Sequence, residues 1–238
     1  MKKVKVFFLG VFFLSLSSLG CVYSQNIDLS AGLVNSYVWR GFKQAGTSVQ
    51  PTLSAEYKGL SLSGWASTDI AGDGKKEVDF TLGYSVSGLT VSVTDYWWDG
   101  EEANKYFSYP KDENTGHMLE AGLSYTLPES FPLSLSWNTF FLGKGNKKAD
   151  GDNSFSTYIE ASYPFRVKDV DLSVSAGFIP WESAVYGPDM NGFKFTSIQL
   201  GASKDIKIND RFSLPVFANV IANPAVEDIH SVFGFTIK

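Results

Sequence analysis

The chain has 238 residues and a formal net charge of −5, from 20 basic and 25 acidic side chains. An acidic chain without a basic patch is not expected to bind nucleic acid, and its single cysteine excludes a framework of disulfides.

The first 24 residues predict a signal peptide. A basic start is followed by the apolar run 6–19, which is shorter than the ~20 residues that a membrane-spanning helix needs. Compact residues then precede Gln25, as a signal peptidase requires. We expect residues 1–24 to be removed, leaving 25–238 as one exported domain. The alternative is a lipoprotein signal with an acylated Cys21, which Gly20 favours and Ser18 disfavours.

The rest of the chain alternates between apolar and polar residues with period 2, the pattern of a β-strand with two unlike faces. In Val170–Phe178, for example, apolar side chains alternate with Asp, Ser and Gly. Such segments predict strands at 27–40, 49–58, 60–69, 77–87, 89–98, 117–127, 133–142, 154–164, 170–180, 193–204, 211–222 and 230–237.

Short and long connections alternate between these segments. Lys58-Gly59 and Ser87-Gly88 are tight hairpin turns, whereas Asp99–Gly116, 143–153 and 181–192 are long. An even number of strands of about ten residues, with short turns opposite long loops, is typical of an outer-membrane barrel. The predicted fold is all-β: a single transmembrane antiparallel β-barrel of about 12 strands in an up-and-down meander, with a periplasmic N-terminus.

The aromatic residues and the serines predict what each face meets. Two aromatic bands fit the interfaces of a membrane. The long-loop band contains Tyr37, Trp39, Trp97, Phe141, Phe155, Phe178 and Phe193, and the short-turn band contains Tyr57, Tyr84, Tyr125, Tyr163, Phe165, Phe212 and Phe235. The polar faces are rich in serine, so we expect the apolar face to meet lipid and the lumen to be wet rather than plugged.

Four segments resemble a known family. The segments SAGLVNSYVWRGFKQAG (30–46), GWASTDI (64–70), EVDFTLGYS (77–85) and DYWWDG (95–100) are similar to those of the TorF-type putative porins of Gram-negative bacteria. The shared elements are Tyr37-x-x-Arg40-Gly41, a Gly-x-Trp-Ala-Ser element and an acidic-aromatic Gly-Tyr strand. The resemblance implies an outer-membrane barrel with a channel role. The chain departs from such barrels at its end, where Phe235 or Ile237 stands in for a terminal aromatic residue.

Catalytic and metal chemistry are not predicted. His117 lies on the outward phase near the long-loop rim, with Asp95 on the strand before, but no Ser or Cys nucleophile shares that patch. The acidic loops 69–74 and 149–154 lack the spacing of a calcium loop. We therefore expect no enzyme activity and no cofactor, although loop carboxylates could bridge divalent ions to lipopolysaccharide.

The charged residues on the lumen phase are the candidate pore-lining residues. By parity they are Arg40, Glu56, Asp69, Glu77, Asp79, Glu120, Glu160 and Asp171. Seven carboxylates against one arginine predict a preference for cations, because charged rings set the ion preference of a pore. Alternatively, Arg40 pairs with a neighbouring carboxylate and ties strands together across the lumen.

The sequence therefore predicts a porin-like channel of the outer membrane for passive diffusion of small solutes or ions. Its expected partners are outer-membrane lipid, lipopolysaccharide and the barrel-assembly machinery. The alternative is a non-conducting barrel scaffold that presents extracellular loops for binding or adhesion. The sequence leaves the solute, the oligomeric state and any folding of Asp99–Gly116 into the lumen open.

Overall fold

The computed structural model describes residues 26–72, 74–99, 106–107, 116–187 and 190–238. The predicted signal peptide, with Cys21, and most of the connection Asp99–Gly116 lie outside these ranges. Among the described residues, no helix has the length and apolar character needed to cross a membrane.

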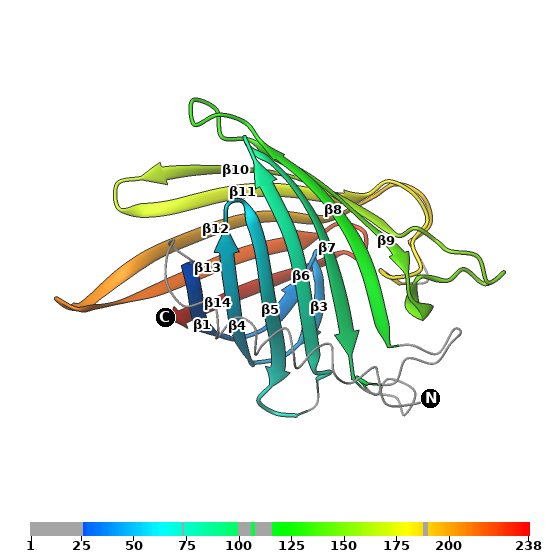
Figure 1. Ribbon diagram of the computed structural model, residues 1–238, viewed down its shortest axis with the longest axis horizontal. Helices are drawn as coiled ribbons and strands as arrows, with labels where there is room; N and C mark the ends of the chain where they lie inside the picture. Colours follow the sequence, from blue (N-terminus) through cyan, green and yellow to red (C-terminus); the bar gives the residue numbers. More distant parts are fainter. Residues whose placement is uncertain (1–25, 73, 100–105, 108–115, 188–189) are drawn as a thin grey trace.

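Twelve strands form one closed antiparallel barrel, and each is hydrogen-bonded to two neighbours (Figure 1). Sequence neighbours pair along the meander, and β1 closes the ring by pairing with both β4 and β14. The barrel strands are β1 (Asn26–Val34), β4 (Ser48–Tyr57), β5 (Leu60–Asp69), β6 (Glu77–Val86), β7 (Leu89–Trp98), β8 (His117–Thr126), β9 (Ser134–Leu142), β10 (Thr157–Val167), β11 (Val170–Ile179), β12 (Lys194–Asn209), β13 (Phe212–Asn223) and β14 (Asp228–Ile237). This confirms the predicted all-β fold, a single antiparallel barrel of twelve strands in meander order. Closure gives every strand of the ring a partner on both sides, although β1 pairs with β14 only over Ala31–Val34.

The short connections have the predicted turn chemistry. Lys58 and Ser87 have φ values of 48° and 50°, and the glycines after them have 84° and 83°. Two successive positive φ angles are what a type I′ hairpin turn requires. Both described ends of the chain, Asn26 and Lys238, lie at this end of the barrel, called the inner end below.

The first predicted strand, 27–40, is wrong beyond Val34. The chain leaves the barrel there and forms a separate two-stranded sheet of β2 (Tyr37–Trp39) and β3 (Phe42–Ala45), called the plug hairpin below. Asn35 ends the barrel strand, because its side chain bonds the backbone of β14 through Ser231 O and Phe233 N. A third type I′ turn, at Arg40-Gly41, then reverses the chain, with φ values of 51° and 88°.

Other strands differ from the prediction mainly at their ends. Ser154 and Phe155 precede β10 rather than belong to it, and Phe155 has a φ of 48°. β12 continues to Asn209, so the β12–β13 hairpin extends beyond its neighbours at the inner end (Figure 1).

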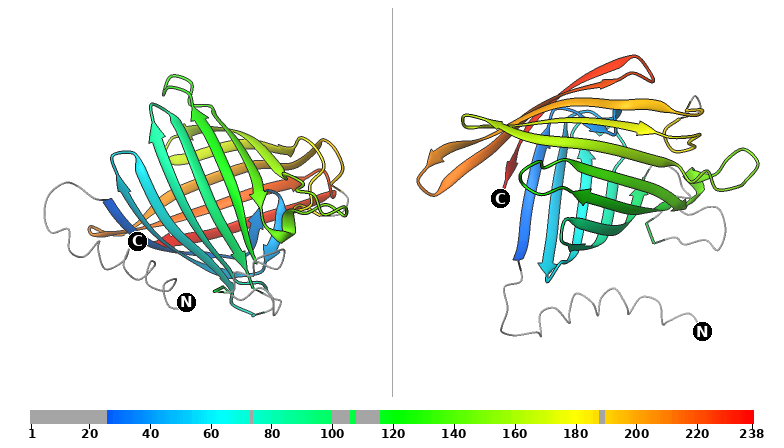
Figure 2. Two further views of the ribbon diagram at one scale, coloured as in Figure 1. Left: turned by 45° about the vertical axis from the view of Figure 1, so that its right-hand side comes forward. Right: turned by 90° about the horizontal axis from the view of Figure 1, so that it is seen from above.

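The outer face of the barrel is apolar and exposed. Leu82, Leu123, Val174 and Leu200 leave 52%, 50%, 42% and 53% of their surface uncovered. Exposed apolar surface on successive strands marks a contact with another apolar phase. Figure 2 shows the wall from two further sides, with the β12–β13 hairpin in orange extending past the other strands. Among the paired strand residues, Asp, Glu, Lys, Arg and His side chains on this phase lie only towards the rims. They are Asp95 and His117 at the outer end and Lys204 towards the inner end.

Candidate functional site: a plugged lumen

The plug hairpin lies inside the outer half of the barrel. At its turn, the Gly41 carbonyl accepts a hydrogen bond of 3.1 Å from Asn223 Nδ2 on β13. A Cβ atom at Gly41 would overlap the backbone carbonyl of Thr196 on β12. Glycine is therefore required here both by its positive φ and by this close approach to the wall.

Trp39 joins two buried clusters that fill this half of the lumen. One cluster consists of Tyr158, Ile179, Tyr186 and Met190, and the other of Tyr96, Met118 and Phe140. The Trp39 ring centroid lies 5.5 Å from that of Tyr186, 5.8 Å from Tyr96 and 6.3 Å from Phe140. The expectation of a wet bore is therefore wrong for the outer half, which is packed like a protein core.

The predicted outer aromatic band is also wrong for the two aromatic residues of the plug. Tyr37 and Trp39 were expected to face lipid, but both lie inside the barrel. The Tyr37 ring packs edge-on against Trp65, at 5.4 Å between centroids. Trp65 shares the lumen phase of β5 with Ser63 and Ser67, as the strand register shows. The alternation through Trp39 is real, but it belongs to a strand of the plug and not to the wall.

Arg40 sits at the turn of the plug and binds the opposite wall. Its Nη1 and Nη2 donate to the two carboxylate oxygens of Glu120 at 2.6 and 2.8 Å. Nη1 also donates to the Tyr186 hydroxyl. The guanidinium carbon lies 4.4 Å from the Trp39 ring centroid and 4.8 Å from that of Tyr158. The alternative that Arg40 pairs with a lumen carboxylate is confirmed, whereas its place on a wall strand is wrong.

The group around this guanidinium is called the cation cage below; it consists of Glu120, Tyr96, Tyr158, Tyr186 and Trp39. The side chains of Arg40 and Glu120 are only 10% and 4% exposed. Tyr96 donates its hydroxyl to Glu120 Oε2 at 2.9 Å, which fixes the carboxylate. Burial raises the pKa of the Tyr186 phenol, so this group stays neutral. The cage combines a bidentate carboxylate with aromatic faces, both of which favour a planar cation.

Glu77 and Asp79 form a second buried acidic group beside the plug. They share one face of β6 and are 2% and 9% exposed. Glu77 Oε1 and Asp79 Oδ1 have no hydrogen-bond partner among the described residues. The Glu77 carboxyl also interacts with the hydroxyl of Tyr37, the first residue of the plug. The plug thus contacts wall carboxylates near both its start and its turn.

The remaining predicted pore-lining residues are spread along the lumen and do not form a ring. Glu160 accepts a 2.8 Å bond from the Tyr158 hydroxyl. The Asp69 carboxylate accepts hydrogen bonds from two backbone amides of neighbouring turns, Gly46 N at 2.8 Å and Ala71 N at 2.7 Å. Glu56 and Asp171 are exposed near the inner mouth.

Sequence reasoning missed some of the lumen charges and the plug itself. Arg166 faces the inner mouth with its Nε 3.4 Å from Asp171 Oδ1, because β10 runs past the predicted end at 164. The signal for the plug was the X-Gly pair Arg40-Gly41, which matches the two other tight turns, Lys58-Gly59 and Ser87-Gly88.

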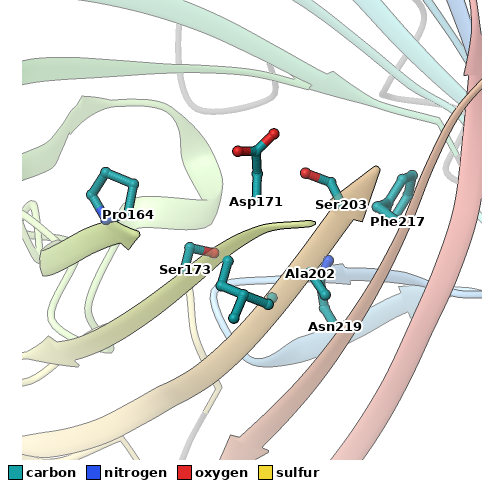
Figure 3. A pocket seen from close by; sticks show the side chains of 9 residues that line it. Pro164, Asp171, Ser173, Ala202, Ser203, Phe217 and Asn219 are labelled. Carbon is teal, nitrogen blue, oxygen red and sulfur yellow. The ribbon is translucent and has the colours of Figure 1, made fainter. Parts of the chain in front are cut away.

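The inner half of the lumen is hollow. A cavity of about 290 Å³ opens among β10, β11, β12 and β13, lined by polar and small residues that include Asp171, Ser173, Ser203 and Asn219 (Figure 3). Asn219 and Ser173 converge over Gly201, where a Cβ atom would lie 2.7 Å from each side chain. The serine-rich lining therefore leaves space below the plug, as the sequence predicts for this half.

His117 and Asp95 form a pair on the outward face at the outer rim. Nδ1 of His117 lies 2.9 and 3.0 Å from the two Asp95 oxygens, and Nε2 lies 2.9 Å from the Tyr106 carbonyl. Both ring nitrogens are engaged, so neither is placed to activate a nucleophile. Within the described parts of the chain, no group of three or more His, Cys, Asp or Glu side chains could hold a metal ion. The absence of enzyme activity and of a cofactor stays a prediction.

The comparisons with known proteins agree with a bacterial origin and leave the function open. A family model described as "Bacterial protein of unknown function (Gcw_chp)" matches residues 20–216. The chain belongs to the Gcw_chp family. No curated protein matches it. A solved structure titled "KdgM porin" is similar at 8% identity and a TM-score of 0.49, with 89% of this chain and 98% of that chain covered. None of these names the TorF-type porins, so that resemblance stays a prediction.

Proposed function

We propose that the protein is a passive channel of the bacterial outer membrane, closed by its own plug hairpin. The observation that carries this proposal is that the plug is not part of the wall. β2 and β3 pair only with each other, and the ring of twelve strands is complete without them. Removal of the plug would therefore leave a closed barrel around an emptied lumen.

The exposed apolar outer face supports the membrane location. Apolar side chains meet lipid along the strands, and Lys204 near the inner end pairs with Asp169 in the β10–β11 turn at 2.6 Å. A lysine that reaches towards a turn carboxylate is typical of a side chain at a membrane interface. The polar hollow beneath the plug supports a solute path.

We further propose that the open lumen prefers cations. Without the plug, Glu120 would lose Arg40, and Glu77 would lose Tyr37, so both carboxylates would face the bore with Asp79. Low-dielectric walls focus the field of like charges, which concentrates cations and repels anions.

A second candidate function is a barrel scaffold that presents its outer connections for binding or adhesion. The packed outer half of the lumen favours this candidate, because Trp39 and its two clusters fill much of that half.

Planar-bilayer recording separates the two functions. We expect a variant with residues 37–45 replaced by a short Gly-Ser linker to conduct steadily and the wild type to conduct rarely. A matched control removes the exposed residues 149–152 from another outer connection and should behave like the wild type. Neutral amides at Asp79, Glu120 and Glu160 in the plug-less variant should shift the reversal potential towards anions. If folded wild-type and plug-less proteins are both silent, the channel is refuted and the scaffold favoured.

A further inference from the structure

The cation cage is built almost entirely from parts that do not belong to the plug. Glu120, Tyr96 and Tyr158 come from the wall strands β8, β7 and β10, and Tyr186 comes from the connection between β11 and β12. Trp39 is the one member of the cage that lies on the plug hairpin, and it would move together with Arg40. The wall therefore carries a preformed cation site, and the chain's own arginine occupies it.

The geometry of this site selects a planar cation with parallel N–H groups. The two oxygens of Glu120 accept one bond each from the guanidinium, at 2.6 and 2.8 Å. The Tyr158 ring lies 4.8 Å from the guanidinium carbon and the Tyr186 ring 5.9 Å from it. A primary ammonium is a point charge and does not reproduce the paired bonds, whereas any guanidinium does.

An empty cage is unfavourable because Glu120 is buried. Glu120 is 3% exposed, and without Arg40 its one remaining hydrogen-bond donor among the described residues would be the neutral hydroxyl of Tyr96. Removal of one partner from a buried ion pair leaves an uncompensated charge, which is strongly destabilising. Movement of the plug out of the lumen is therefore unfavourable unless another cation replaces the Arg40 guanidinium beside Glu120.

We infer that the cation cage is a binding site for small solutes that carry a guanidinium group, and that such a solute opens the lumen by displacing Arg40. A solute that binds the unplugged state and not the plugged one shifts the equilibrium towards opening. Arg40 is tethered, so it competes as an intramolecular ligand, and the free solute must exceed its effective concentration. The opening step rests on the proposed channel function, whereas the binding step does not.

The binding step is tested on a full-length protein whose cage is vacant. Calorimetry should detect L-arginine amide binding to the Arg40→Ala variant, and at least tenfold weaker binding of L-citrulline amide, in which a neutral urea replaces the guanidinium. Adding Glu120→Gln should also weaken binding at least tenfold. Folding is checked by heat-modifiable gel mobility, and Arg40→Gln replaces Arg40→Ala if the latter does not fold. Equal affinity for the two amides, or no binding to a folded variant, overturns the inference.

The opening step is tested on the wild-type protein in a planar bilayer. Millimolar L-arginine amide should raise the open probability several-fold, and L-citrulline amide at the same concentration should not. If the plug-less variant conducts but arginine amide leaves the wild type closed, the displacement step is wrong and the channel stands. If no variant conducts while arginine amide binds the vacant cage, the channel proposal fails and the binding site stands.

Discussion

The environments of the two faces of β11 can be distinguished by substituting arginine at each of two neighbouring residues, in two separate variants. Val174 pairs with Tyr163 and Leu200 on the outward phase near the middle of the strand, and it is 42% exposed. Arginine on the lipid face near the bilayer midplane costs about 2–4 kcal/mol. Since 1.4 kcal/mol is a factor of ten, Val174→Arg should raise the unfolded-to-folded ratio about 30- to 1,000-fold.

The matched variant is Ser173→Arg, one residue earlier. Ser173 lines the cavity of about 290 Å³, whose polar lining includes Ser203 and Asn219, so a new arginine there stays in a polar space. A charged substitution that stays solvated should change stability by no more than about 0.5 kcal/mol.

Urea titration of both variants in lipid vesicles measures this difference, and heat-modifiable gel mobility reports the folded fraction. The urea concentration at which half of the protein is unfolded should be clearly lower for Val174→Arg than for the wild type. For Ser173→Arg it should stay near the wild-type value. Equal losses for the two variants, or a greater loss for Ser173→Arg, would show that the outward face does not meet lipid.

The remaining predictions concern the packed lumen and the orientation of the barrel. Phe140→Ala should lower the free energy of unfolding by about 3–5 kcal/mol, because Phe140 is fully buried between Trp39 and Tyr96; Phe141→Ala, at a site 36% exposed, should cost less in the same urea titration. A protease site inserted after Asp150 should be cut in intact cells and one at Ser87-Gly88 should not; the reverse pattern would mean that the barrel is inverted.

The sequence predicted the wall of the barrel because the wall obeys a local rule. Each strand has an apolar and a polar face with period 2, and Lys58-Gly59 and Ser87-Gly88 have the chemistry of a type I′ turn. Such signals are contained within about ten neighbouring residues. The strand count, the alternation of short and long connections and the lumen phase of Glu77, Glu120 and Glu160 all follow from them.

The plug could not be predicted in the same way, because period 2 does not say which sheet a strand joins. Tyr37 and Trp39 alternate as a wall strand would, and their aromatic rings suit a lipid interface as well as a packed core. Only the closed ring decides between the two: β4 already occupies the position beside β1, so the intervening residues have no place in the wall.

The cation cage was also decided by tertiary structure alone. Arg40 and Glu120 are far apart in the sequence, as are Arg40 and Tyr186, and no spacing rule connects them. The sequence supplied an arginine and an excess of lumen carboxylates, and therefore the general expectation of a pair. The choice of Glu120 follows from where the plug turn at Gly41 meets the wall, because only a residue without a side chain can approach Thr196 and Asn223 that closely.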